Sequence, residues 1–146
     1  GSFSKSRSLA GLRLGYAFSR PEHIAALERI KYSFHPYNVN RLTQQAGVIA
    51  VEDDAYLSHV LEKITATRDR TALRLQELGC RVLPSSANFL FVAHPSLMGR
   101  ELYQKLREKG MLVRCFEHPR TLEFVRVSIG TDEEMKAFLH AVEETL

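Results

Sequence analysis

Several features that identify common classes of protein are missing from this sequence of 146 residues. It contains neither Gly-x-Gly-x-x-Gly nor a Walker-type Gly-Lys-Ser/Thr motif, so nucleotide binding loses its usual sequence support. Neither Ser-Asp-Asn nor Lys-Thr-Gly occurs, which argues against a serine acyl-transfer enzyme although Ser2 and Lys5 have the Ser-x-x-Lys spacing. No secretory core or membrane-spanning apolar run is present, and we expect a soluble cytoplasmic protein without a membrane partner.

Cysteine and net charge are also scarce. The two cysteines, Cys80 and Cys115, match no metal-binding or redox spacing, so we expect free thiols in or beside strands. The carboxylates at residues 52–54 have no histidine or further acid at ligand spacing, and they favour helix capping over a metal site. The net charge is only +3 and the cations are interspersed with acids, which argues against a nucleic-acid partner.

The most informative stretch is at the start, in residues 2–16. It combines hydroxyl side chains and two glycines with three cations, Lys5, Arg7 and Arg13. Hydroxyls and turn amides can donate to phosphate oxygens, glycines let the backbone come close, and an arginine fork can hold two oxygens. The stretch therefore predicts a phosphate site, and a solvated basic loop is the alternative that composition leaves open.

The first half of the chain predicts a short strand followed by helices. The strand covers residues 11–18, and a helix begins at Pro21 and ends before His35, because the residue before a proline avoids the helical region. Four apolar residues predict that one side of this helix packs against a core: Ile24, Leu27, Ile30 and Phe34. We further expect a buried helix over residues 42–51, capped by Asn38 or Asn40, and a long helix over 55–78.

The second half alternates short strands and helices. Strands are expected at residues 80–83, 88–92, 111–116 and 124–129, with a helix between the second and third. A last helix begins at Thr131, where Thr131 and Glu134 form a capping box. This order predicts an α/β fold, a small lobe with a short sheet covered by helices.

One strand carries a cation at its centre. In residues 124–129, Val125 and Val127 share one face and Arg126 shares the other with Ser128. A guanidinium in that position can meet an anion in a cleft. The alternative is a charge that protects an edge strand from aggregation.

The opening motif resembles a known family. Ser-x-Ser-Lys, followed by Ser-Leu-Ala-Gly-Leu-Arg-x-Gly-Tyr, is similar to the lysine segment of pyridoxal-phosphate-dependent aminotransferases, and more narrowly to their histidinol-phosphate branch. The resemblance implies that Lys5 forms the Schiff base with the aldehyde of the cofactor, pyridoxal 5'-phosphate. It also implies that Ser2, Ser4 and Arg13 bind the cofactor phosphate.

Three later segments resemble the same family. Arg-Val-Ser-Ile-Gly-Thr resembles the segment whose arginine, here Arg126, grips the acidic group of the substrate. Leu-Val-Arg implies that Arg114 helps to hold the substrate phosphate, as in the histidinol-phosphate branch. Asn88, within Ser-Ala-Asn-Phe-Leu, matches a position near the substrate, and its alternative role is to satisfy backbone groups at the start of a strand.

The resemblance implies the carboxyl-terminal part of an aspartate aminotransferase-like fold. Residues 1–40 would end the large cofactor domain, 41–79 would be connecting helices, and 80–146 would form the small α/β domain. In this family the acid that pairs with the pyridine nitrogen precedes the lysine segment, and here only four residues precede Lys5. We therefore expect little activity from this chain alone.

The function implied is transamination of histidinol phosphate with 2-oxoglutarate or glutamate, by a homodimer in the complete enzyme. The substrates would be small molecules, a phosphate-bearing amine and a 2-oxo acid. Two alternatives stay open at this point. One is a pyridoxal-phosphate-dependent decarboxylase of a phosphorylated amino acid, and the other is a non-catalytic anion-binding or interaction module.

Overall fold

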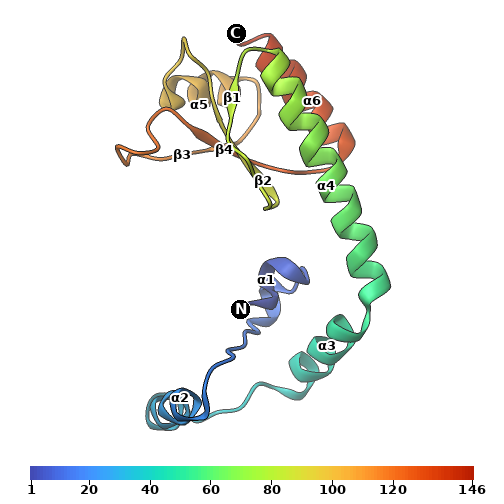
Figure 1. Ribbon diagram of the computed structural model, residues 1–146, viewed down its shortest axis with the longest axis vertical. Helices are drawn as coiled ribbons and strands as arrows, with labels where there is room; N and C mark the ends of the chain where they lie inside the picture. Colours follow the sequence, from blue (N-terminus) through green and yellow to red (C-terminus); the bar gives the residue numbers. More distant parts are fainter. The chain divides into compact units, whose positions relative to one another are not determined.

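The structure is a computed structural model that describes residues 1–146, and the chain divides into two compact units, Gly1–Ser58 and His59–Leu146. The first unit holds helix α1 (Phe3–Ser6), the 3-10 turn η1 (Ala10–Leu12), α2 (Pro21–Phe34) and α3 (Arg41–Glu52). Helix α4 (Asp54–Glu77) begins in the first unit and continues into the second (Figure 1). None of the helices combines the length and the apolarity needed to cross a membrane.

The strand expected over residues 11–18 is wrong. Part of it forms η1, and the turn ends at Arg13, whose φ of 54° lies in the left-handed region. Strand pairing is limited to one isolated antiparallel bridge between Gly15 and Ser2, and the nitrogen of Tyr16 donates to the carbonyl of Gly1 at 3.0 Å. The nitrogen of Phe3 donates to the carbonyl of Leu14 at 3.1 Å. The chain therefore closes into a loop over residues 2–16, which we call the lysine loop.

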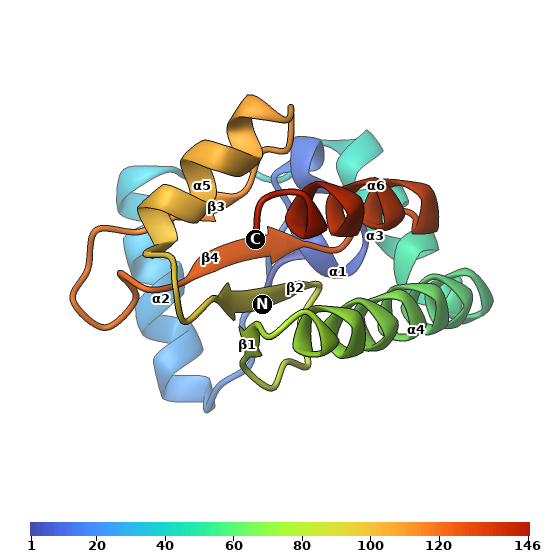
Figure 2. The same ribbon diagram turned by 90° about the horizontal axis from the view of Figure 1, so that it is seen from above.

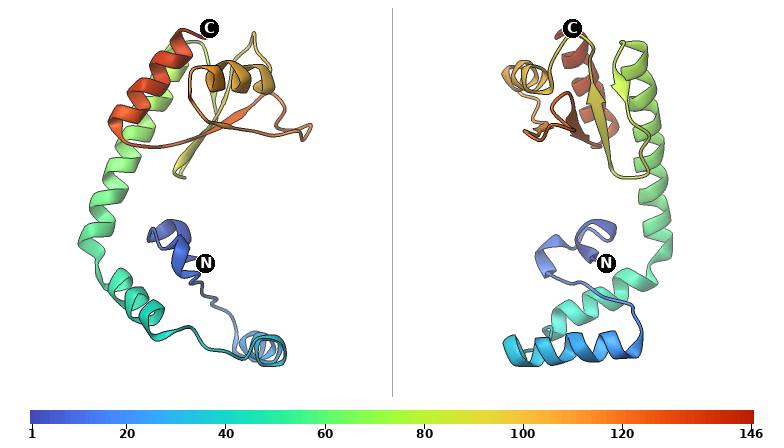
Figure 3. Two further views of the ribbon diagram at one scale, coloured as in Figure 1. Left: turned by 180° about the vertical axis from the view of Figure 1, so that it is seen from behind. Right: turned by 60° about the vertical axis from the view of Figure 1, so that its left-hand side comes forward.

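Helix α2 has the expected bounds but not the expected packing. It starts with Pro21 at its first position and is capped at His35, as the sequence predicted. Figure 3 shows the extended blue stretch that leads from the lysine loop into this helix. No residue of α2 is buried, and Phe34 is 90% exposed. The prediction that its apolar side packs against a core is wrong within this chain, because no segment covers that side.

Helix α3 is capped as predicted, since Oδ1 of Asn40 accepts a hydrogen bond from the nitrogen of Thr43 at 2.9 Å. Its burial is limited to Thr43 and Gly47. A Cβ on Gly47 would lie 2.6 Å from Cδ2 of Leu14, so α3 contacts the lysine loop closely at this glycine. The expected buried helix is otherwise wrong, because four of its apolar side chains are exposed: Leu42, Val48, Ile49 and Val51.

The second unit contains a four-stranded antiparallel sheet. Its strands are β1 (Arg81–Val82), β2 (Phe89–Ala93), β3 (Arg114–Cys115) and β4 (Val125–Ser128), in the order β1-β2-β4-β3. Figure 2 shows β2 and β4 side by side and pointing in opposite directions. The expected strand over residues 111–116 is present only as the two residues of β3.

Three helices pack on one face of this sheet: α4, α5 (Gly99–Glu108) and α6 (Asp132–Glu143). The buried cluster joins strand residues to helix residues, and it contains Leu75, Cys80, Leu90, Val92, Leu102, Leu106, Val125, Val127, Met135, Phe138, Ala141 and Val142. Burial of these apolar side chains is the main favourable term in folding of the unit. The expected α/β lobe is confirmed, and its helices lie on the face that carries Val125 and Val127.

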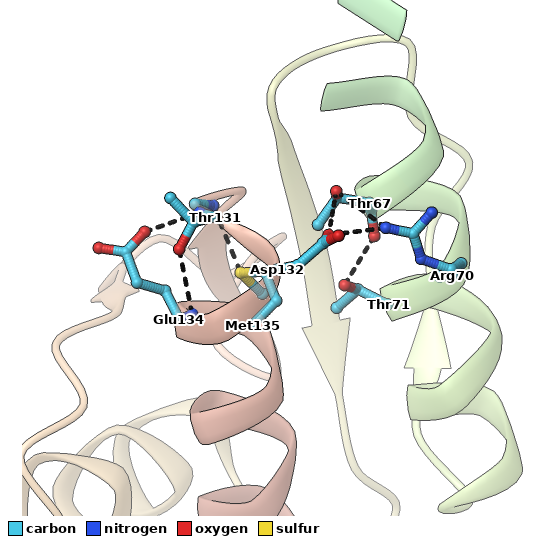
Figure 4. Close-up of polar contacts among 8 residues, drawn as sticks. Thr67, Arg70, Thr71, Thr131, Asp132, Glu134 and Met135 are labelled. Atoms are coloured by element: carbon cyan, nitrogen blue, oxygen red, sulfur yellow. Dashed lines mark hydrogen bonds and ion pairs between the residues drawn. The ribbon is translucent and has the colours of Figure 1, made fainter. Parts of the chain in front are cut away.

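Polar contacts hold α6 alongside α4. The hydroxyl of Thr67 donates to Asp132 at 2.6 Å, and Arg74 pairs with Glu143 at 2.6 Å near the other end of α6 (Figure 4 shows the first contact). The expected capping box is present, because the nitrogen of Thr131 donates to Glu134 at 2.7 Å and the nitrogen of Glu134 donates to Thr131 at 3.2 Å.

Candidate functional site

The lysine loop presents Lys5 on the short helix α1. Ser2 caps this helix, because its Oγ accepts a hydrogen bond from the nitrogen of Ser4 at 3.1 Å. The hydroxyl of Ser6 donates back to the carbonyl of Ser2 at 3.0 Å. Lys5 itself is exposed, and its amine makes no hydrogen bond or ion pair in the chain. The loop therefore fixes the backbone around Lys5 while leaving its amine available for chemistry.

Arg13 lies at the other end of the loop. Its Nη1 donates to the carbonyl of Ala10 at 3.1 Å, and the remaining guanidinium donors have no partner in the chain. Ser8 and Arg13 have φ values of 56° and 54°, a left-handed conformation that costs a residue with a side chain roughly 1–2 kcal/mol. Strain of this kind concentrates at ligand-binding segments, which supports the predicted phosphate site.

Arg7 is a residue of the loop to which sequence reasoning gave no binding role. Its Nη1 is buried and has no hydrogen-bond partner. A buried guanidinium donor without an acceptor is costly, because desolvation is not compensated. The sequence shows only that Arg7 is one of three cations in residues 2–16. Burial of its guanidinium nitrogen could not be inferred from that.

The second unit brings together Arg114 and Arg126. They are direct partners in the register of β3 and β4, and neither guanidinium forms an ion pair with a carboxylate of the chain. Like charges directly opposite each other on neighbouring strands are destabilising. The pair therefore provides a site that a dianion would stabilise, and Arg126 shares its face with Ser128 as expected.

Asn88 lies immediately before β2 and is exposed. Its backbone carbonyl accepts a hydrogen bond from the nitrogen of Ile129 at 2.9 Å, and its side chain makes no hydrogen bond in the chain. Its side chain therefore remains available for a ligand. The backbone pairing at the start of the strand is made without it.

The predicted site residues form two groups. Ser2, Ser4, Lys5 and Arg13 belong to the lysine loop of the first unit. The other three, Asn88, Arg114 and Arg126, belong to the second unit. Each group concentrates donors for anions: hydroxyl, amine and guanidinium groups in the first, and two guanidiniums with an amide in the second.

Comparison with known proteins identifies the family to which this chain belongs. Residues 1–142 match the family described as aminotransferase class I and II, and the chain belongs to that family. The family depends on pyridoxal phosphate and acts on small molecules. The fold is therefore of the aspartate aminotransferase type, as the sequence predicted.

The chain is similar to particular members of this family. It is 49% identical over 143 residues to the histidinol-phosphate aminotransferase of Chromohalobacter salexigens, covering 98% of this chain and 41% of the relative. It is 46% identical over 140 residues to that of Brachyspira hyodysenteriae, covering 96% of this chain and 40% of the relative. The chain thus spans about two-fifths of the length of these curated relatives.

A solved structure gives the same result. The histidinol-phosphate aminotransferase of Sinorhizobium meliloti, in complex with pyridoxal-5'-phosphate, superimposes with a TM-score of 0.84 at 30% identity. The match covers 98% of this chain and 39% of that one. Both units of the chain therefore have counterparts in a cofactor-bound member of the family.

Proposed function

We propose that the protein to which this chain belongs transfers an amino group between histidinol phosphate and 2-oxoglutarate, using pyridoxal phosphate held by Lys5. The observation that carries the proposal is the amine of Lys5, which is exposed and without a partner on a helix capped by Ser2. A nucleophilic lysine needs an unshared amine, and the family match includes this segment.

The donors of the lysine loop fit the cofactor. The hydroxyl of Ser4 makes no hydrogen bond in the chain, and Arg13 keeps free guanidinium donors, so both are available to phosphate oxygens. Pyridoxal phosphate supplies an electron sink when it is bound. In this proposal Lys5 tethers the cofactor and then, once displaced by the incoming amine, moves the proton at the substrate carbon with its Nζ.

The second unit would hold the substrate. Arg114 and Arg126 offer two forks that suit the phosphate of histidinol phosphate and, in the other half-reaction, the distal carboxylate of glutamate or 2-oxoglutarate. Asn88 would contact the substrate through its free side-chain amide. The decarboxylase alternative is not favoured, because the similar curated relatives are named histidinol-phosphate aminotransferases.

The remaining expectations belong to the same proposal. The complete protein would be a cytoplasmic homodimer. Residues 1–40 would belong to the large domain, 41–79 to connecting helices and 80–146 to the small domain. Since this chain spans about two-fifths of its relatives, it would be poorly active by itself.

Covalent labelling tests the assignment of Lys5. The chain is incubated with pyridoxal phosphate, reduced with borohydride and mapped by mass spectrometry. We expect label on Lys5, none at that position in Lys5→Ala, and an unchanged pattern in the control Lys31→Arg, which alters a helix α2 lysine bonded to Asn38. Labelling spread over surface lysines and unaffected by Lys5→Ala would refute the assignment.

Product analysis of the complete protein tests the reaction. With histidinol phosphate and 2-oxoglutarate we expect glutamate in an amount equal to the amine consumed, and no carbon dioxide. In a parallel assay with a phosphorylated amino acid in place of histidinol phosphate, which has no carboxylate to lose, release of carbon dioxide would instead support a decarboxylase. The absence of either product, together with unselective labelling, would support a non-catalytic anion-binding module.

A further inference from the structure

The face of the sheet opposite the helices has an unusual composition. By strand alternation and by contact, it carries four aromatic and three cationic side chains: Phe89, Phe91, Phe116, Phe124, Arg81, Arg114 and Arg126. We call it the arginine–phenylalanine face. The apolar core lies on the other face, so these aromatic rings are not explained by packing of the helices alone.

Phe116 occupies a special place on this face. Its ring stacks on Phe91, with 5.7 Å between centroids and an interplanar angle of 15°. Cζ of Arg114 lies 5.6 Å from its centroid and Cζ of Arg126 lies 5.9 Å from it. Phe116 is therefore the one ring that contacts both members of the arginine pair, and Phe91 of β2 stacks on it from the far side of β4.

The pair needs such a contact because its charges repel each other. Neither guanidinium has a carboxylate partner, although Arg81 on the same face pairs with Glu123. An aromatic face attracts a guanidinium through its quadrupole and restricts its rotamers without neutralising its charge. The ring can therefore hold two cations side by side and leave their donors free for an anion.

We propose that Phe116 is a positioning residue that fixes the spacing of Arg114 and Arg126, so that the two forks grip one dianion. This inference rests on the proposed function, because it assumes that the pair binds the substrate's phosphate. Preorganised donors lose less side-chain entropy when the ligand arrives. A phosphate dianion, which can use both forks, gains more from this spacing than a single carboxylate, which needs one.

Arg81 and Phe124 provide an internal control. Cζ of Arg81 lies 4.8 Å from the ring of Phe124, and this ring contacts Phe91 but is not within cation–π distance of the arginine pair. Phe124 is 8% exposed and Phe116 is half-buried, so replacing Phe124 should disturb the packing of the sheet at least as strongly. A variant of Phe124 therefore separates the effect of lost packing from the effect of losing the ring that contacts Arg114 and Arg126.

The test is a titration of the full chain with inorganic phosphate and, separately, with acetate. Binding is followed by NMR at the backbone amides of residues 114–116 and 125–128, so that phosphate bound elsewhere does not contribute. We expect Phe116→Leu to weaken phosphate binding by roughly five-fold, the effect of losing exposed cation–π contacts, and acetate binding by less. Phe116→Tyr, which keeps the ring, should restore the affinity, and Phe124→Leu should leave it unchanged.

Two kinds of failure are distinguishable. Phosphate affinity that is equal in Phe116→Leu and the unaltered chain, or equally weakened in Phe124→Leu, would overturn the role of Phe116. In that case a loss of affinity in Arg126→Lys would still support the anion site. If Arg126→Lys also binds phosphate with unchanged affinity, the substrate site in the proposed function is itself wrong.

Discussion

Thr67 on α4 donates a hydrogen bond to Asp132 at the first position of α6, across 2.6 Å and 65 residues of sequence. Arg70, one turn further along α4, donates to the same carboxylate at 2.6 Å (Figure 4). The hydrogen bond from Thr67 and the charge and hydrogen bond of Arg70 lower the pKa of Asp132 below its ordinary value of 3.8. This contact joins two helices of the second unit and depends on ionisation of the carboxyl group.

The pH dependence of stability follows from that lowered pKa. A carboxyl group with a lower pKa in the folded state stabilises the fold at pH values above its unfolded pKa, and this contribution disappears as the pH falls through the folded pKa. Asp132→Asn should therefore lower the free energy of unfolding at neutral pH and flatten its decline below about pH 4. Urea unfolding at several pH values measures this. The control is Glu133→Gln, at an exposed neighbouring position of α6. This variant should leave the decline of the unfolding free energy at acidic pH unchanged.

The capping box of α6 gives a second prediction. Replacing Thr131 by Ala removes the oxygen that accepts from the nitrogen of Glu134, and should cost about 1 kcal/mol of unfolding free energy. Thr131→Ser keeps that oxygen and should cost much less. Equilibrium unfolding in urea compares the two variants, and equal losses in both would show that the methyl group, not the cap, is responsible.

The two cysteines should differ in reactivity. Burial raises the pKa of the Cys80 thiol, whose residue is only 6% exposed, whereas Cys115 is half-buried in β3. A raised pKa lowers the fraction of the thiol that is present as the reactive thiolate at a given pH. We expect iodoacetamide at pH 8 to modify Cys115 first, as followed by mass spectrometry over time. Faster modification of Cys80 would mean that the core of the second unit opens readily.

Truncating an exposed apolar side chain of the first unit should have a much smaller effect on stability than truncating a buried one of the second unit. Phe34 on α2 is 90% exposed, so Phe34→Ala should change the free energy of unfolding by less than about 0.5 kcal/mol and reduce self-association. Phe138, which is 5% exposed in the core, is the matched site, and Phe138→Ala should cost about 3–5 kcal/mol. Urea unfolding and light scattering measure the two effects. A large loss of stability in Phe34→Ala would show that α2 is covered in solution.

Features that depend on neighbours in sequence were predictable. The cap of α3 by Asn40 and the box of Thr131 and Glu134 each act over three residues, so side-chain type and spacing suffice to predict them. The alternation in β4 likewise placed Arg126 opposite the core. Helix bounds followed from the same local rules, as the end of α2 at His35 shows.

Features that depend on partners far along the chain were not predictable. Arg114 faces Arg126 only because β4 lies between β2 and β3, which is a property of the sheet order. The periodicity of α2 indicated an apolar side but could not say what covers it. The error over residues 11–18 has the same origin, since an apolar stretch needs a partner strand, and this one finds only a single bridge between Ser2 and Gly15.

Backbone strain in the lysine loop gives the last prediction. Ser8 has a φ of 56°, which glycine adopts without a steric penalty, so Ser8→Gly should stabilise the loop by up to about 1 kcal/mol, less the entropy that glycine adds to the unfolded chain. Ser6→Gly is the control, because Ser6 lies in α1 and its hydroxyl donates to Ser2, so this variant should destabilise the loop. Hydrogen exchange at the amide of Leu9, which donates to Phe3 at 3.1 Å, reports loop opening directly. Slower exchange in Ser8→Gly and faster exchange in Ser6→Gly would locate the strain at Ser8, whereas faster exchange in both would mean that the left-handed conformation is not strained there.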